Sequence, residues 1–168
     1  LDPSFGAAGK VITAIGATSD TVRALVVQPD GKLVVAGVCL SGGNGVFCLA
    51  RYTADGSLDP AFGSGGKVIT SISSNGDNTA RAIALQPDGK LVAAGYCYNG
   101  SNVDFCLARY NTNGSLDASF GNNGTVVTAI GSGDDNANAL ALQPDGKLVA
   151  AGTCAAGSNT SFCLARYN

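Results

Sequence analysis

The six cysteines are the residues whose type and spacing could do the most chemistry. They form three pairs whose members are nine residues apart, namely Cys39 and Cys48, Cys97 and Cys106, and Cys154 and Cys163. Such thiols could bridge one another or bind a metal ion. A metal site is disfavoured because the chain has no His and no Cys-x-x-Cys pair. We therefore predict a disulfide within each pair, with bridges between repeats or between subunits as the alternative.

Three repeated disulfides would place the protein in an oxidising compartment, because cytosolic thiols are kept reduced. The sequence therefore predicts an extracellular or cell-surface location.

The remaining polar residues offer little for catalysis. All twelve acidic residues are Asp, and both His and Glu are absent, so acid–base work would fall on Asp, Lys, Tyr or Cys. The sequence contains no Gly-x-Ser-x-Gly elbow, phosphate loop or dinucleotide fingerprint. We therefore expect a protein that is not an enzyme and that holds no cofactor and no metal.

Composition also disfavours two classes of partner. The net charge is −2 and only 13% of the residues are charged, so the chain lacks the basic surface that nucleic acid requires. The longest nearly apolar run, Leu33 to Leu40, is far shorter than the roughly 20 residues that span a bilayer. We expect neither nucleic-acid binding nor membrane insertion.

The cysteine pairs are embedded in a repeat. The motif QPDGKL, an alternating apolar run and FCLARY recur three times, at Gln28 to Tyr52, Gln86 to Tyr110 and Gln143 to Tyr167. Aligning these segments divides one repeat domain, residues 1–168, into three units. The units are residues 1–57, 58–115 and 116–168, which we expect to be three blades.

Each unit contains four segments of strand character. In the first unit these are Lys10–Ile15, Val22–Gln28, Lys32–Cys39 and Phe47–Thr53, and the equivalents of the first segment are Lys67–Ile72 and Thr125–Ile130. Pro29, Asp30 and Gly31 between the second and third segments are typical of a hairpin turn. The pattern predicts an all-β protein with four antiparallel strands in each unit and almost no helix.

The strands carry apolar side chains on both faces. In the third segment Leu33 and Val35 point to one side, and Val34 and Ala36 point to the other. A sheet that is apolar on both faces must lie between two similar sheets, as a blade does in a β-propeller. A flat β-solenoid is the second possibility.

The segments LDPSFGAAGKVIT, VRALVVQPDGKLVVAG and FCLARYTADGS resemble the delta-60 repeat of bacterial secreted and surface proteins. The resemblance extends over three units and essentially the whole chain. It implies a propeller-like fold, an extracellular location and no catalytic activity. The third unit departs from the pattern at Ala118 and Thr125, and the paired cysteines are an addition to it.

Three blades are fewer than the four to eight of a closed propeller. The ring would be incomplete, so either other copies complete it or the chain belongs to a longer array. We therefore expect a structural protein that self-associates through its blades into a ring or a filament.

The segments between paired cysteines differ among the repeats although their flanks are nearly identical. Tyr96, Tyr98 and Asn99 of the second repeat could form a platform for a sugar, because an aromatic face with amide donors suits carbohydrates. A lectin-like or adhesive module that binds glycans is thus the alternative function. Solvated loops without a ligand are the simpler interpretation.

Charged residues also recur in equivalent places, namely Arg51, Arg109 and Arg166 in an apolar strand and Asp2, Asp59 and Asp117 at the start of each repeat. We interpret them as ion pairs that hold strands or blades together. Asp55 with Asp59, and Asn111 with Asn113 and Asp117, could suggest calcium, but they lack the spacing of a calcium-binding loop.

Overall fold

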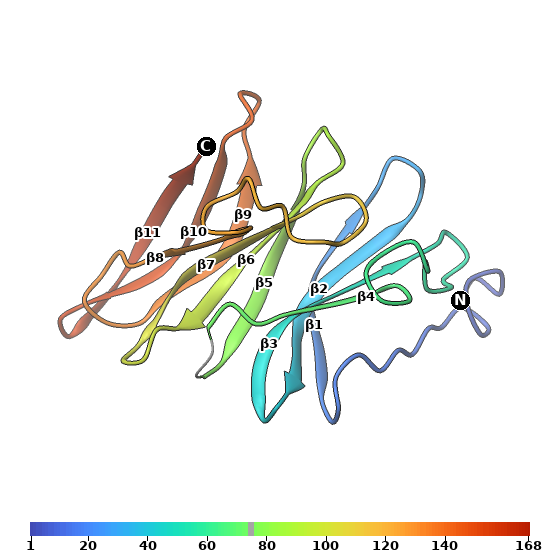
Figure 1. Cartoon of the computed structure of the whole chain (residues 1–168), viewed down its shortest axis with the longest axis horizontal. Helices are drawn as coiled ribbons and strands as arrows, with labels where there is room; N and C mark the ends of the chain where they lie inside the picture. Colours follow the sequence, from blue (N-terminus) through green and yellow to red (C-terminus); the bar gives the residue numbers. More distant parts are fainter. Residues whose placement is uncertain (74–75) are drawn as a thin grey trace.

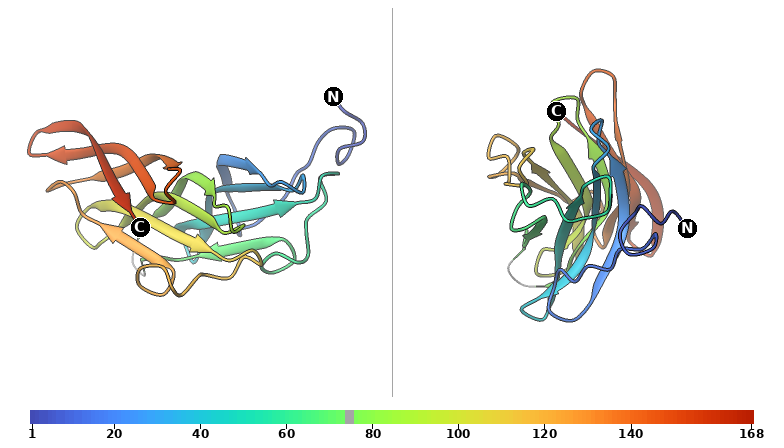
Figure 2. Two further views of the ribbon diagram at one scale, coloured as in Figure 1. Left: turned by 90° about the horizontal axis from the view of Figure 1, so that it is seen from above. Right: turned by 90° about the vertical axis from the view of Figure 1, so that its right-hand side faces the viewer.

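The computed structural model describes residues 1–73 and 76–168 and contains eleven strands in that part of the chain. Three antiparallel sheets follow one another in a row, with the two chain termini at opposite ends (Figures 1 and 2). The fold is all-β, as predicted, and the row does not close into a ring. The described residues include no helix that could cross a membrane.

Each sheet is a meander in which strands that follow in sequence are neighbours in space. Sheet 1 consists of β1 (Asp20–Val27), β2 (Leu33–Ser41), β3 (Asn44–Tyr52) and β4 (Lys67–Thr70). Sheet 2 consists of β5 (Asn78–Leu85), β6 (Leu91–Tyr98), β7 (Val103–Tyr110) and β8 (Thr125–Thr128). Sheet 3 consists of β9 (Asp135–Leu142), β10 (Leu148–Ala156) and β11 (Asn159–Tyr167).

The Pro-Asp-Gly turns connect the first two strands of each sheet. In sheet 1 the amide of Gln28 donates to the carbonyl of Lys32 at 2.8 Å, and Gly31 has a φ of +82°, which favours glycine. The Asp30 side chain accepts a hydrogen bond from the Lys32 amide at 3.2 Å. The same backbone bond recurs at Gln86 and Gln143, so this hairpin prediction is confirmed in all three sheets.

Every first strand also contains a bulge that the sequence pattern did not predict. The pairing of β5 with β6 shifts between Ala80 and Ala82, which leaves Arg81 without an opposite residue. The strand backbone then comes so close to Gly95 that a Cβ atom there would lie 1.8 Å from the carbonyl oxygen of Thr79. Gly37 and Gly152 occupy the equivalent places opposite the other two bulges.

The sheets do not coincide with the sequence repeats. The strand Lys67–Thr70 belongs to the second repeat but pairs with β3 of the first, and Thr125–Thr128 of the third repeat pairs with β7. Each four-stranded sheet therefore crosses a boundary between the units 1–57, 58–115 and 116–168. The expectation that each repeat forms its own four strands is wrong.

Two predicted strands are shorter than expected and one is absent. Lys67–Ile72 and Thr125–Ile130 end at Thr70 and Thr128, because the chain then crosses to the next sheet. Lys10–Ile15 forms no strand. Its partner would be the last strand of a preceding sheet, and the described residues contain none.

Apolar side chains fill the two interfaces between sheets. Phe47 and Leu49 of sheet 1 pack with Leu91 of sheet 2, and Phe105 of sheet 2 packs with Leu148 of sheet 3. Sheet 2 is thus buried on both faces, as the two-sided pattern predicted, whereas no sheet of the described residues covers the outer faces of sheets 1 and 3. Ile15 covers part of the outer face of sheet 1.

The contact between Gly95 and the bulge yields a test of the fold. We expect Gly95→Ala to lower the free energy of unfolding by at least about 2 kcal/mol, because the methyl group would overlap the Thr79 carbonyl. Gly65→Ala is the control. Its φ is +58° but its Cβ would meet nothing within 4 Å, so it should cost only about 1 kcal/mol. Denaturant unfolding of the oxidised chain measures both, and equal losses would contradict the assignment.

Candidate functional site

All three cysteine pairs form disulfides within a hairpin. They join Cys39 to Cys48, Cys97 to Cys106 and Cys154 to Cys163, with Cα–Cα distances of 5.8, 5.8 and 6.0 Å. We had expected the cysteines of each pair to lie directly opposite one another in the hairpin, and this expectation is wrong. The described residues contain no free cysteine. Three disulfides indicate an oxidising environment, such as the cell exterior or the periplasm.

The register of the hairpin explains the offset of the cysteines. Cys39 lies opposite Val46, and Cys48 lies opposite Gly37, so the bridge runs diagonally between residues two positions apart on one face. The strands also continue past the cysteines. The segment expected to be a loop is therefore mostly hairpin, and in the first repeat only Gly42 and Gly43 form the turn.

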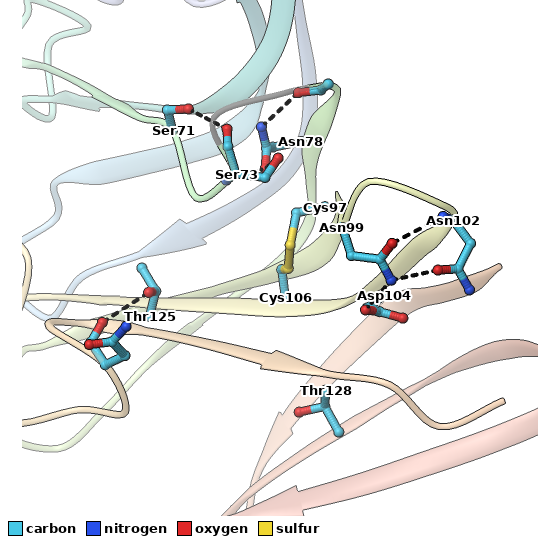
Figure 3. Close-up of a disulfide and its surroundings, with 12 residues drawn as sticks. Ser71, Ser73, Asn78, Cys97, Asn99, Asn102, Asp104, Cys106, Thr125 and Thr128 are labelled. Carbon is cyan, nitrogen blue, oxygen red and sulfur yellow. Dashed lines mark hydrogen bonds between the residues drawn. A yellow bond between two sulfur atoms is a disulfide. The ribbon is translucent and has the colours of Figure 1, made fainter. Parts of the chain in front are cut away.

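The second hairpin differs from the other two because it ends in a longer loop. Asn99 organises this loop: its side-chain oxygen accepts hydrogen bonds from the amides of Ser101 and Asn102, at 2.9 and 3.1 Å. Its side-chain nitrogen donates to Asp104 at 2.7 Å, beside the Cys97–Cys106 bridge (Figure 3). Asn99 thus supports the loop, and its polar atoms are already used within the protein.

Tyr96 and Tyr98 of β6 line a cavity of about 470 Å³ together with residues of β7, of β9 and of the segments that precede β5 and β9. The other lining residues are Gly76, Asp77, Val103, Asp134 and Asn136. The Arg81 guanidinium lies 4.8 Å from the centre of the Tyr96 ring. Aromatic rings next to carboxylates form a surface that could stack on a sugar and accept hydrogen bonds from its hydroxyl groups.

Two carboxylates of this cavity already fasten neighbouring sheets. Asp77 accepts a hydrogen bond from the Gly45 amide at 2.7 Å, and Asp134 accepts one from the Val103 amide at 3.1 Å. Sequence reasoning missed both residues, because their partners are about half a repeat away in the chain.

The recurring arginines and aspartates form charged clusters between consecutive repeats. Arg51 pairs with Asp59 at 2.9 Å, and Lys32 contacts the same carboxylate at 3.0 Å. The Arg51 guanidinium also lies 4.6 Å from the centre of the Phe62 ring. The predicted ion pair between Arg and Asp is thus present, and Lys32 adds a second cation to the carboxylate.

The second cluster repeats this geometry. Arg109 pairs with Asp117 at 2.8 Å, Lys90 contacts Asp117 at 3.0 Å, and the guanidinium lies 4.5 Å from the centre of the Phe120 ring. The Ser119 hydroxyl, followed by the Lys90 ammonium, holds the pKa of Asp117 well below its usual range.

The third set of charged residues is divided between the two ends of the molecule. Arg166 and Lys147 belong to sheet 3 and its hairpin turn, whereas Asp2 lies in the N-terminal segment at the other end (Figure 1). Lys147 contacts Asp145 at 2.7 Å, and Asp2 accepts hydrogen bonds from Ser4. The structure therefore brings together two of the three predicted pairs.

The residues considered for calcium have other partners. Asp55 accepts a hydrogen bond from the Ser57 amide, and Asn113 accepts one from the Ser115 amide, both at 3.0 Å within tight turns. Asp59 and Asp117 face the cationic side chains described above.

The outer faces of the row expose apolar side chains that are buried at equivalent places inside. On sheet 3, Phe162 is 94% exposed and Leu164 is 67% exposed, whereas Phe105 and Leu107 of sheet 2 are fully buried. On sheet 1, Val22 and Leu25 are more than half exposed. The two ends of the row thus carry unpartnered apolar surfaces.

Three segments of the chain match one family model, described as a domain of unknown function (DUF5122) beta-propeller. They are residues 28–62, 86–120 and 143–168, and together they make up more than half of the chain. No curated protein matches the chain.

The lowered pKa of Asp117 predicts how stability depends on pH. A carboxyl group whose pKa is lower in the folded state stabilises the fold above its unfolded pKa of about 3.9 and loses that contribution as pH falls through the folded value. We expect the free energy of unfolding of Asp117→Asn to fall less steeply than that of the wild type below about pH 4. Asp88→Asn, at an exposed turn, is the control, and denaturant titrations at several pH values measure the slopes. Parallel slopes for the Asp117 variant and the wild type would contradict the prediction.

Proposed function

The chain belongs to the DUF5122 β-propeller family, and we propose that it is a non-enzymatic extracellular structural protein whose blades associate with those of other copies. The product would be a surface assembly or a filament. The observation that carries the proposal is the exposed apolar surface at both ends of the row, formed by Val22 and Leu25 on sheet 1 and by Phe162 and Leu164 on sheet 3.

Removing these apolar surfaces from water would favour association. Burying one large apolar side chain contributes about 1.5–3 kcal/mol, and several such side chains lie together on each outer face. The equivalent side chains within the chain form the interfaces between sheets. Association through these faces would therefore repeat a packing mode that the fold already uses.

The location and the lack of catalysis rest on different observations. Three disulfides support a secreted or surface-displayed protein, and the resemblance to delta-60 repeats points the same way. A non-catalytic role is supported by the absence of His and Glu from the sequence and by the use of all six cysteines in disulfides.

Ring and filament differ only in the rotation between neighbouring copies. A head-to-tail contact whose rotation closes gives a ring, and one whose rotation does not close gives an open filament. A ring of two copies would contain six blades, within the range of known propellers.

Self-association predicts a concentration-dependent mass. We expect the oxidised chain to form species larger than the 16.6 kDa monomer in sedimentation velocity and light scattering, and particles in electron micrographs. Leu164→Asp should raise the concentration at half-assembly at least about tenfold, because it places a charge in the apolar contact. Val127→Asp, half exposed on β8, is the control. A wild-type chain that stays monomeric at all concentrations would overturn the proposal.

The cavity lined by Tyr96 and Tyr98 favours a second candidate function, a lectin-like or adhesive module that binds glycans. The cavity combines two aromatic rings with the carboxylates of Asp77 and Asp134, and it lies at the hairpin that differs most among the repeats. In this function the three repeats would serve as a scaffold, and the second hairpin would carry the binding site.

A glycan array tests this alternative directly. If the module binds sugars, Tyr96→Ala should weaken binding at least about tenfold, because a stacking ring is lost. Val38→Ala, at the equivalent position of the first repeat, is the matched control and should bind like the wild type. An array on which the wild type binds nothing would contradict the glycan-binding function.

A further inference from the structure

Two internal junctions show how one repeat is joined to the next. The strand β4 adds to the edge of β3 with Leu49 opposite Val68 and Phe47 opposite Thr70. The strand β8 adds to β7 in the same register. Each junction thus consists of a sheet edge from one repeat and a short strand from the next.

The N-terminal segment contains a third sequence of this kind, which pairs with no sheet among the described residues. Lys10–Thr13 aligns with Lys67–Thr70 and Thr125–Thr128, but its residues form no strand, and Ile12 is 98% exposed. The local contacts around it are nevertheless the same. Ala7 donates to the Lys10 carbonyl at 2.8 Å, as Ser64 does to Lys67.

Both ends of this segment are tied to the molecule. The amide of Gly6 donates to the Asp55 carbonyl at 2.7 Å, which matches the 2.8 Å bond from Gly63 to Asn113. The amide of Ile15 donates to the Asp20 carboxylate at 2.8 Å, which matches the bond from Ile130 to Asp135. Lys10–Thr13 is therefore held in place by contacts on both sides of it.

The opposite end of the molecule offers the corresponding edge. In the described residues β11 pairs only with β10, and its other edge is open. The residues that align with Phe47 and Leu49, namely Phe162 and Leu164, lie on this strand and are exposed. The N-terminal segment Lys10–Thr13 and the open edge of β11 therefore have the composition of the two halves of an internal junction.

Charge complementarity supports the same match. In both internal junctions an Asp from the start of a repeat lies between the Arg and Lys of the preceding repeat. Arg166 and Lys147 are the equivalent cations of the last repeat, and Asp2 is the equivalent anion of the first. Phe5 likewise aligns with the rings over which Arg51 and Arg109 lie.

The apolar faces also correspond. Phe47 and Leu49 pack with Ala80, Leu91 and Ala93 in the first internal interface. The equivalents of the last three residues are Val22, Leu33 and Val35, which line a groove of about 280 Å³ on the outer face of sheet 1. The two valines give this face more apolar surface than the alanines give the internal one.

We propose that copies of this chain join head to tail by strand addition, with Lys10–Thr13 of one copy extending sheet 3 of the next along β11. The junction would pair Thr13 with Phe162 and Val11 with Leu164, and Asp2 would lie between Arg166 and Lys147. This inference rests on the proposed self-association and specifies its partner and its register.

The register predicts which amides of the added strand face β11. The Arg51 amide donates to the Gly66 carbonyl at 2.9 Å, and hydrogen-bonded pairs alternate along an antiparallel ladder. Val68 and Thr70 therefore exchange hydrogen bonds with β3, whereas Ile69 does not. By the same pattern the Thr13 amide faces β11 and the Ile12 amide points away.

A photo-crosslinking residue at position 12 of the full 168-residue oxidised chain tests the contact. We expect intermolecular crosslinks to residues 162–165, identified by mass spectrometry, because Ile12 would lie opposite Cys163. Assemblies whose crosslinks map only elsewhere would overturn strand addition but leave the proposed self-association intact. A wild-type chain that does not assemble would overturn both.

A pair of proline substitutions tests the register independently. Thr13→Pro removes an amide that faces β11 and should raise the concentration at half-assembly at least about tenfold. Ile12→Pro is the matched control and should have a smaller effect. Circular dichroism verifies that each monomer is folded, and equal effects of the two variants would overturn the register.

Charge reversal tests the position of Asp2. Asp2→Arg and Arg166→Asp should each raise the concentration at half-assembly about tenfold or more, and the double variant should recover most of the loss. Asp88→Lys, at the exposed turn between β5 and β6, is the control and should assemble like the wild type. If the double variant showed the combined loss of assembly of the two single variants, with no recovery, the Asp2–Arg166 contact would be contradicted.

Discussion

A sheet that is apolar on both faces has to be covered on both faces, and most features of this molecule follow from that requirement. Sheet 2 meets it within the chain, because sheets 1 and 3 cover its two sides. The outer sheets meet it fully on one side only, and on their other side Leu25 and Phe162 are exposed to water. Each such side chain could contribute about 1.5–3 kcal/mol if it were buried, which supports the proposed association.

The junctions between repeats give this stacking its direction. Because β4 comes from the second repeat and completes the sheet of the first, neighbouring repeats are joined by backbone hydrogen bonds as well as by apolar contact. The cluster of Arg51, Lys32 and Asp59 adds a charged contact at the same place. A junction of this kind is polar along its edge and apolar across its face, so it fixes both register and orientation.

The disulfides lie between the variable hairpin tip of each repeat and the strands that form the junctions. Each bridge lies within one hairpin, and the tip beyond it contacts the next sheet through the backbone amides of Gly45 and Val103, so the side chains of the tip can vary while these contacts remain. The second tip shows such a change, since Asn99 and Asp104 support a longer loop beside the cavity of Tyr96 and Tyr98. Assembly and ligand binding would therefore use different surfaces of the same scaffold.

The sequence by itself determined the features that depend on neighbouring residues. The hairpin turns, the pairing of cysteines nine residues apart and the two-sided apolar strands are local patterns, and the structure contains all three. Only the tertiary structure decided the sheet to which Lys67–Thr70 adds, the bulge at Arg81 and the diagonal offset of Cys39 and Cys48. These features depend on pairing between strands that are distant in the sequence or on a shift of register by one or two residues, and composition and spacing encode neither.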